Sequence, residues 1–145
     1  MFLGQYRHSL DDKNRLTIPS RFRELLSDGA YVTRGFDRNL MVLTTSAFQK
    51  MYDHLNSMNV ADQNSRQVRR MILGNAYHLE VDKSGRILIS QNLREFINLK
   101  AEAVLVGQGD YFEVWAPDLW QKQEKLLDDT DANAQRYSTL NVATR

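Results

Sequence analysis

Short apolar segments follow one another along this chain in the order strand, strand, helix, strand, strand, helix. Two-residue alternation is typical of a half-buried strand, and a 3.6-residue spacing of apolar side chains is typical of a helix packed on a core. These periods predict a short helix over 21–26, which Ser20 can cap, and a longer helix from Ser46 to Leu55. The predicted strands are 6–10, 15–18, 31–34 and 40–44.

The same succession is repeated in the second half of the chain. Tyr6 to Pro19 aligns with Tyr77 to Ser90 without a gap, and one inserted residue brings the later blocks into register. Each copy, 6–55 or 77–127, is small for an independent core, so we expect the copies to share one, within the chain or between chains. The second copy predicts helices over 91–97 and 118–127 and strands at 103–106 and 111–115.

A turn with the pattern Asp-x-x-x-Arg joins the first two strands of each copy, as Asp11/Arg15 and Asp82/Arg86. Asp and Asn side chains bond to nearby backbone in turns, and Asn and Gly best tolerate a positive φ. Each turn is therefore predicted to be held by its carboxylate and to place an arginine at the start of the return strand. The predicted structural turn residues are Asp11, Asp82, Asn14 and Gly85.

Two segments lie outside the copies. Residues 60–73 predict a basic helix with Val68, Met71 and Ile72 toward the core and arginines outward. Residues 128–145 have few apolar side chains and no periodicity, which indicates a flexible or loosely held extension. The predicted organisation is a first repeat at 1–56, a basic linker helix at 57–75, a second repeat at 76–127 and a C-terminal tail at 128–145.

Composition narrows the class of protein. The chain has 145 residues, no cysteine and a formal net charge of +1. It has neither an apolar run long enough to span a bilayer nor a signal-peptide pattern, which favours a cytoplasmic protein without a membrane partner. Positive charge gathers around the two turns and the segment between them. Residues 62–100 hold seven Lys/Arg against four Asp/Glu, whereas residues 101–145 hold four against eight.

The arginines at the two turns are the candidate binding residues. Arginine forms paired hydrogen bonds with guanine or phosphate and is the commonest direct reader of DNA bases. Arg15 and Arg86 are therefore predicted to bind double-stranded DNA, whereas Asp11 and Asp82 are given a structural role because phosphate repels carboxylate. The further DNA-binding candidates are Lys13, Lys83, Arg23, Arg94 and Arg7. Arg21 is a candidate on the same grounds as Arg7.

The run from Asp11 through Arg15-Leu16-Thr17-Ile18-Pro19 to Phe22-Arg23-Glu24 resembles the AbrB type of swapped-hairpin barrel. With both copies, the joining segment 66–76 and the opening Met1-Phe2-Leu3-Gly4, the chain is similar to the MraZ family over residues 1–127. The resemblance implies an α+β, mostly β fold of two tandem AbrB-like units forming one pseudo-two-fold barrel with flanking helices. It also implies a nucleoid-associated transcriptional regulator, ring-shaped homo-oligomers and repeated boxes in the promoter of its own division and cell-wall gene cluster. Asn14 stands where the family usually has glycine.

Other functions are less well supported by the residues. His8, His54 and His78 have no metal-ligand spacing, and the chain has no glycine-rich phosphate loop and no recognisable nucleophile–base pair. We therefore predict no catalysis, no cofactor, no metal and no small-molecule substrate. A non-catalytic oligomeric scaffold and an RNA-binding protein remain alternatives, because basic loops on β-rich domains serve both polymers.

Overall fold

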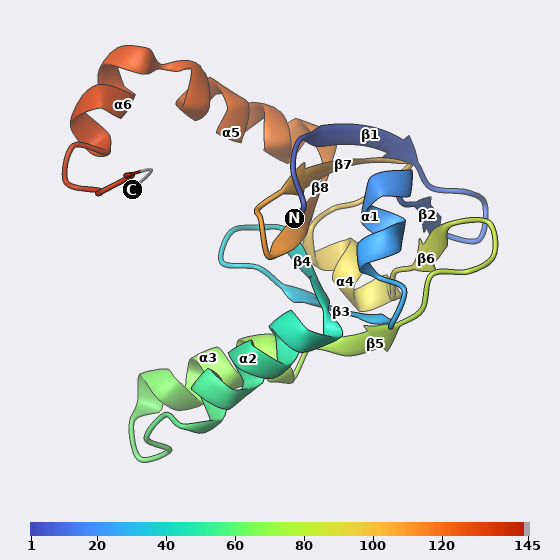
Figure 1. Cartoon of the computed structure of the whole chain (residues 1–145), viewed down its shortest axis with the longest axis horizontal. Helices are drawn as coiled ribbons and strands as arrows, with labels where there is room; N and C mark the ends of the chain where they lie inside the picture. Colours follow the sequence, from blue (N-terminus) through green and yellow to red (C-terminus); the bar gives the residue numbers. More distant parts are fainter. Residues whose placement is uncertain (144–145) are drawn as a thin grey trace.

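The structure, a computed structural model, describes residues 1–143 (Figure 1). Strands and helices alternate as the periodicity predicts. The first copy contains β1 (Gln5–Ser9), β2 (Arg15–Thr17), α1 (Ser20–Leu25), β3 (Ala30–Arg34), β4 (Leu40–Thr44) and α2 (Thr45–Asn56). α3 (Gln63–Leu73) follows. The second copy contains β5 (Tyr77–Leu79), β6 (Arg86–Leu88), α4 (Gln91–Phe96), β7 (Glu102–Gly107), β8 (Tyr111–Trp115) and α5 (Pro117–Asp128), and α6 (Thr130–Arg136) comes last.

Two local expectations need correction. Ser20 does not cap α1, because Pro19 occupies the N-cap position and no side chain bonds to the first turn. Residues 130–136 form the helix α6, although no element was predicted there. Asp129 caps α6 by accepting a hydrogen bond from the Ala132 N–H at 3.1 Å, and the side chains of this helix stay outside the core. The signal for α6 is thus a cap rather than an apolar face.

The two copies exchange strands. Within residues 1–143, the main sheet has the order β1-β7-β8-β4-β3-β5, and β2 pairs with β6 in a separate two-stranded ribbon. β1 of the first copy lies beside β7 of the second, with Tyr6 opposite Leu105. β5 of the second copy lies beside β3 of the first, with His78 opposite Tyr31. Because the first strand of each copy completes the hairpin of the other, neither copy has a sheet of its own.

The main sheet is open rather than closed into the predicted barrel. It ends at β1 on one side and β5 on the other, and within residues 1–143 these strands are not paired with each other. Both edge strands are short, and their chains turn away into the ribbon after Leu10 and Leu79. Of the expected α+β, mostly β fold, the combination of helices with mostly antiparallel strands is confirmed. The mostly β content and the closed pseudo-two-fold barrel are not, since within residues 1–143 the helices hold more residues than the strands.

The core lies between the concave side of this sheet and the ribbon with α1 and α4 (Figure 1). Phe22 of α1 packs edge-on to Phe2 at 5.1 Å and 4.9 Å from Phe112 of β8, measured between ring centroids. Leu16 and Ile87, which face each other across the ribbon, are fully buried. Burial of these two side chains fixes which face of the ribbon points outward, since strand residues alternate between faces.

Two helical pairs leave the body at one end of the molecule, α2–α3 and α5–α6 (Figure 1). α3 is anchored by Ile72, which is buried and whose carbonyl accepts a 2.5 Å hydrogen bond from the Thr33 hydroxyl of β3. α5 is anchored by Trp120, which packs against Trp115 of β8 at 5.6 Å between ring centroids. Among the described residues, no helix is both long and apolar enough to cross a membrane.

Candidate nucleic-acid interface

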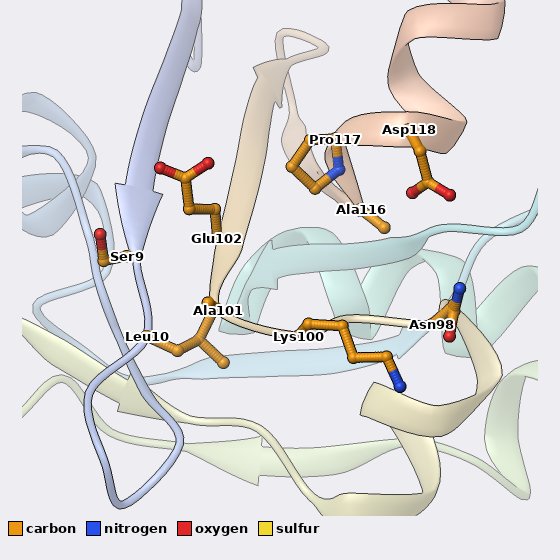
Figure 2. A pocket seen from close by; sticks show the side chains of 9 residues that line it. All are labelled: Ser9, Leu10, Asn98, Lys100, Ala101, Glu102, Ala116, Pro117 and Asp118. Atoms are coloured by element: carbon orange, nitrogen blue, oxygen red, sulfur yellow. The ribbon is translucent and has the colours of Figure 1, made fainter.

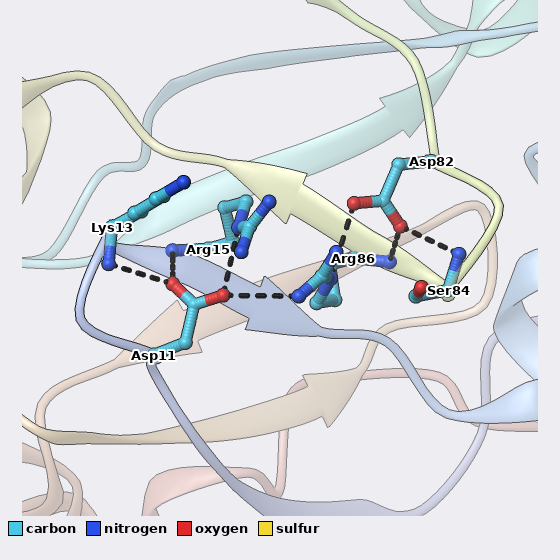
Figure 3. A network of polar contacts seen from close by, with 6 residues as sticks. All are labelled: Asp11, Lys13, Arg15, Asp82, Ser84 and Arg86. Atoms are coloured by element: carbon cyan, nitrogen blue, oxygen red, sulfur yellow. Dashed lines mark hydrogen bonds and ion pairs between the residues drawn. The ribbon is translucent and has the colours of Figure 1, made fainter.

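The β2–β6 ribbon brings the two Asp-x-x-x-Arg turns together, at the end of the molecule away from the helical pairs (Figures 1 and 3). The strands are antiparallel, with Arg15 opposite Leu88 and Thr17 opposite Arg86. Since Leu16 and Ile87 face the core, these four residues form the outer face of the ribbon. The two arginines are far apart in the sequence and become neighbours only through this pairing.

The first turn is held by Asp11. Its Oδ1 accepts hydrogen bonds from the backbone N–H of Lys13 at 3.0 Å and of Arg15 at 2.9 Å. Its Oδ2 accepts a 2.7 Å hydrogen bond from Arg15 Nε. Asn14 has a φ of 62°, so the predicted left-handed residue is confirmed. The carboxylate therefore fixes both the backbone of the turn and the direction of the Arg15 side chain.

The second turn repeats this arrangement around Asp82. Oδ1 accepts hydrogen bonds from the backbone N–H groups of Ser84 and Arg86, both at 2.9 Å, and Oδ2 accepts one from Arg86 Nε at 3.1 Å. Gly85 has a φ of 77°. Arg86 also donates from Nη1 to Asp11 Oδ2 at 3.2 Å, which links the two turns (Figure 3). Arg86 is thus bound by two carboxylates and Arg15 by one.

These contacts lower the pKa of both carboxyl groups. For Asp11 the largest cause is the hydrogen bond from the Arg15 backbone N–H, with further lowering from the Arg15 guanidinium and the Lys13 N–H. For Asp82 the largest cause is the corresponding Arg86 N–H, followed by the Ser84 N–H. Hydrogen bonds to the charged form favour it, so both groups stay ionised at neutral pH.

Arg23 and Arg94 occupy equivalent places beneath the ribbon. Arg23 is half-buried, and its Nε donates to the Ile18 carbonyl at 2.7 Å. Its guanidinium lies against Gly85, where an added Cβ would stand 2.2 Å from Arg23 Cζ. Arg94 donates from Nη1 to the Ile89 carbonyl. Burial, followed by the charge of Arg23, lowers the pKa of His8 on β1. Through their bonds to the Ile18 and Ile89 carbonyls, which directly follow β2 and β6, the Arg23 and Arg94 guanidinium groups support the ribbon.

The remaining predicted residues fall into two groups. Lys13 and Lys83 are exposed on the two turns, on either side of the arginine pair. Arg7 lies on β1 instead, 3.6 Å from Glu102 Oε2, and lines a hollow with Trp120 of α5. Since Tyr6 of the same strand packs on Phe22 in the core, Arg7 points from the opposite face of the sheet. The structure does not bring Arg7 together with the turns.

The residues missed by the sequence analysis are Thr17 and Leu88, which complete the outer face of the ribbon. Leu88 is 58% exposed although it lies between charged neighbours, and Thr17 is half-buried. Their alternation with Leu16 and Ile87 indicated an outward position, but strand periodicity does not say which outward residues meet across a pairing. The charges of this surface nearly balance. Its basic residues are Arg15, Arg86, Lys13 and Lys83, and its acidic residues are Asp11, Asp12 and Asp82.

A separate cleft of about 700 Å³ lies where β1, β7 and the start of α5 meet (Figure 2). Its charged groups are Lys100, Glu102 and Asp118, which come from different elements and make no ion pair with one another. Within residues 1–143, no group of three or more His, Asp or Glu side chains is placed to hold a metal ion. The cleft is open and lacks a hydrogen-bonded nucleophile–base pair, so the ribbon is the better candidate for function.

Comparison with known proteins agrees with the duplication. The model of a family described as "MraZ protein, putative antitoxin-like" matches the chain twice, at residues 1–71 and 72–141. The chain belongs to the MraZ family. The first match includes the turn with Arg15 and ends within α3. The second includes the turn with Arg86 and ends after α6.

Relatives of similar length share most of the chain. A protein of Roseiflexus castenholzii is 44% identical over 138 residues, which cover 95% of this chain and 94% of the relative. One of Thermomicrobium roseum is 40% identical, covering 97% of this chain and 99% of the relative. One of Clostridium acetobutylicum is 33% identical, covering 98% and 100%. Each of these relatives is named "Transcriptional regulator MraZ", a name that describes a role other than catalysis.

Proposed function

We propose that this protein is a transcriptional regulator that binds double-stranded DNA through the outer face of the β2–β6 ribbon. The observation that carries the proposal is the convergence of the two turns, with Arg86 Nη1 and Arg15 Nε bound to the same carboxylate oxygen of Asp11. A two-stranded ribbon is one of the few elements that fits the major groove of B-form DNA. Its position at a free end of the molecule leaves room for a duplex.

The arginines supply the contacts to bases. Within residues 1–143, neither Nη nitrogen of Arg15 has a hydrogen-bond partner, and Arg86 retains Nη2. The Asp11 and Asp82 carboxylates hold the Nε sides and so restrict the rotamers of the two arginines, whose side chains are 31% (Arg15) and 27% (Arg86) exposed. A pre-oriented guanidinium loses less entropy when it binds guanine O6 and N7. Lys13 and Lys83, exposed at the flanks, are assigned to phosphate, whereas Arg23 and Arg94 position the ribbon.

One chain alone offers only a small and nearly neutral surface, so we propose that several copies act together. An apolar groove of about 790 Å³ lies between α2–α3 and the sheet, with the exposed Phe36 and Met1 on its rim. At the other helical pair, Leu126 and Leu127 of α5 are about half exposed. Burial of these surfaces between copies would form a homo-oligomer. The resemblance to the family implies that this oligomer is a ring. Linked ribbons would then gain affinity for repeated boxes through effective concentration.

The target follows from the family resemblance. We propose repeated boxes in the promoter of the protein's own division and cell-wall gene cluster, and a place at the nucleoid in the cytoplasm. The scaffold alternative has one observation in its favour, namely the same apolar groove, which would serve assembly without DNA. The RNA alternative is less favoured, because the major groove of A-form RNA is too deep and narrow for side chains to reach the bases.

The decisive experiment is a titration against duplex DNA from the region upstream of the protein's own gene. Arg15→Ala/Arg86→Ala is compared with Arg70→Ala/Lys122→Ala, which removes the same charge from exposed positions on α3 and α5. We expect the first pair to abolish specific binding, the second to preserve it, and wild-type affinity to fall steeply with salt. A duplex RNA of the same sequence and a DNA with a single box are included as competitors.

Three results would count against the proposal. Equal binding by the two double variants would remove the ribbon from the interface. Absence of binding by the wild type, with an unchanged oligomer mass by light scattering, would favour the scaffold. Dissociation of the oligomer by Arg15→Ala/Arg86→Ala would show that the arginines are structural.

A further inference from the structure

The outer face of the ribbon has one feature that its charges do not explain, which is Leu88. The side chain is 58% exposed and belongs to the residue directly opposite Arg15, and the other members of this outer face are Thr17 and Arg86. At the equivalent position of the first copy the chain has Thr17, opposite Arg86. An isolated exposed leucine is common on protein surfaces, but this one occupies a quarter of a four-residue face.

We propose that Leu88 contacts the 5-methyl group of a thymine next to the guanine bound by Arg15, and that the two ends of the ribbon recognise unlike half-sites. The inference rests on the proposed DNA binding and adds a specificity-determining residue to it. Thymine is the only base with an apolar group in the major groove, and apolar side chains recognise it there. The Arg15/Leu88 end therefore selects guanine beside thymine, and the Arg86/Thr17 end presents a smaller methyl and a hydroxyl.

The spacing of the ribbon fits this assignment. Residues directly opposite in an antiparallel pair have Cβ atoms about 4.5–5.5 Å apart. Stacked base pairs of B-form DNA rise about 3.4 Å per step. A side chain opposite Arg15 thus reaches a base one or two steps from the guanine, which is where a thymine methyl would stand.

The hydrogen bonds of the arginines make the ends unlike in a second way. Arg86 donates to Asp82 and Asp11, whereas the Arg15 side chain donates to Asp11 alone. Arg15 consequently keeps both Nη nitrogens without a partner for a bidentate contact, whereas on Arg86 only Nη2 is without a partner and Nη1 already donates to Asp11. The end with the freer arginine is also the end with the leucine, so both differences direct the stronger discrimination to the same half-site.

A contact between copies of the protein is the competing explanation for an exposed leucine. The apolar groove, however, is lined by residues of the N-terminus, α1, β4, α2, α3 and the β3–β4 and β7–β8 turns and includes none from the ribbon. The ribbon lies at the other end of the molecule from the helical pairs (Figure 1). Leu88 is therefore placed with the arginines and apart from the surfaces that we assign to assembly.

The test replaces each thymine of the bound upstream duplex, one at a time, by deoxyuridine, which lacks only the methyl group. With wild-type protein we expect one position in each box to weaken binding about fourfold, the amount that one buried methyl-sized group contributes. With Leu88→Ala the overall affinity should fall and this deoxyuridine effect should vanish, and with Leu88→Thr it should shrink. Leu3→Ala, which alters a side chain of 59% exposure outside the ribbon, should leave the effect intact.

The outcomes separate this inference from the proposed function. If the wild type binds DNA and loses binding with Arg15→Ala/Arg86→Ala, but no deoxyuridine position matters, only the Leu88 assignment is overturned. The Leu88 assignment is also overturned if the deoxyuridine effect is equal in wild type and Leu88→Ala, or if Leu88→Ala changes the oligomer mass while Leu88→Thr keeps the full effect. If the wild type does not bind DNA, the proposed function itself fails.

Discussion

Replacement of Gly85 by alanine should destabilise the protein about twice as much as the same replacement at Gly109. Both glycines have a positive φ, 77° and 84° respectively, so both variants suffer similar backbone strain. That strain is about 1–2 kcal/mol for a residue with a Cβ. The two sites differ in their surroundings, because a Cβ at Gly109 meets nothing within 4 Å, whereas one at Gly85 stands 2.2 Å from Arg23 Cζ and 2.3 Å from its Nε.

The extra cost at Gly85 is the displacement of Arg23. Its Nε donates a 2.7 Å hydrogen bond to the Ile18 carbonyl, and a hydrogen bond to a charged group contributes about 1.5–3 kcal/mol. Arg23 is only half-buried, which places the loss at the lower end of that range. We therefore expect Gly85→Ala to lose about 3 kcal/mol of unfolding free energy and Gly109→Ala about half of that.

The assay is urea unfolding at pH 7, followed by fluorescence of the buried Trp115 and Trp120. Protein concentration is held constant across variants, since assembly would contribute to apparent stability. In the Arg23→Ala background the difference between the two glycine variants should disappear, because the group that collides is gone. Equal losses for Gly85→Ala and Gly109→Ala in the wild-type background would refute the packing of Arg23 against the second turn.

Three further predictions concern the turns. Arg15→Lys keeps the charge but loses the bidentate fork, so affinity for unrelated DNA should stay within about twofold while preference for the box falls at least tenfold, as competition titrations would show. Asp11→Asn removes one negative charge beside both arginines, so binding to unrelated DNA should tighten and its salt dependence steepen; an unchanged salt slope would contradict this electrostatic role. The lowered pKa of Asp82 in the folded protein stabilises the fold above the pKa of an unfolded aspartate, about 3.9, and this stabilisation is lost as pH falls through the folded pKa. Asp82→Asn should therefore lose less urea resistance than the wild type between pH 5 and pH 2.

Local chemistry allowed much of the chain to be predicted. Strand and helix periods placed the main elements within three residues, the largest error being the start of the basic helix, because apolar spacing reports which side chains face a core. The turns were also predictable, since Asp11 and Asp82 bond to backbone within four residues and Asn14 and Gly85 have the required φ. α6 was not, because it is held by its Asp129 cap and by a hydrogen bond from Asn133 Nδ2 to the Leu127 carbonyl of α5 rather than by an apolar stripe.

What the sequence by itself determined is the duplication, the order of elements and the two carboxylate-held turns, all of which depend on neighbours along the chain. Only the tertiary structure decided that β1 pairs with β7 and β2 with β6, and so that Arg86 meets Asp11. It also placed Arg7 on another face and Leu88 opposite Arg15. The physical reason is that periodicity specifies the face on which a side chain lies, whereas the strand that will lie opposite depends on which shared core buries the most apolar surface.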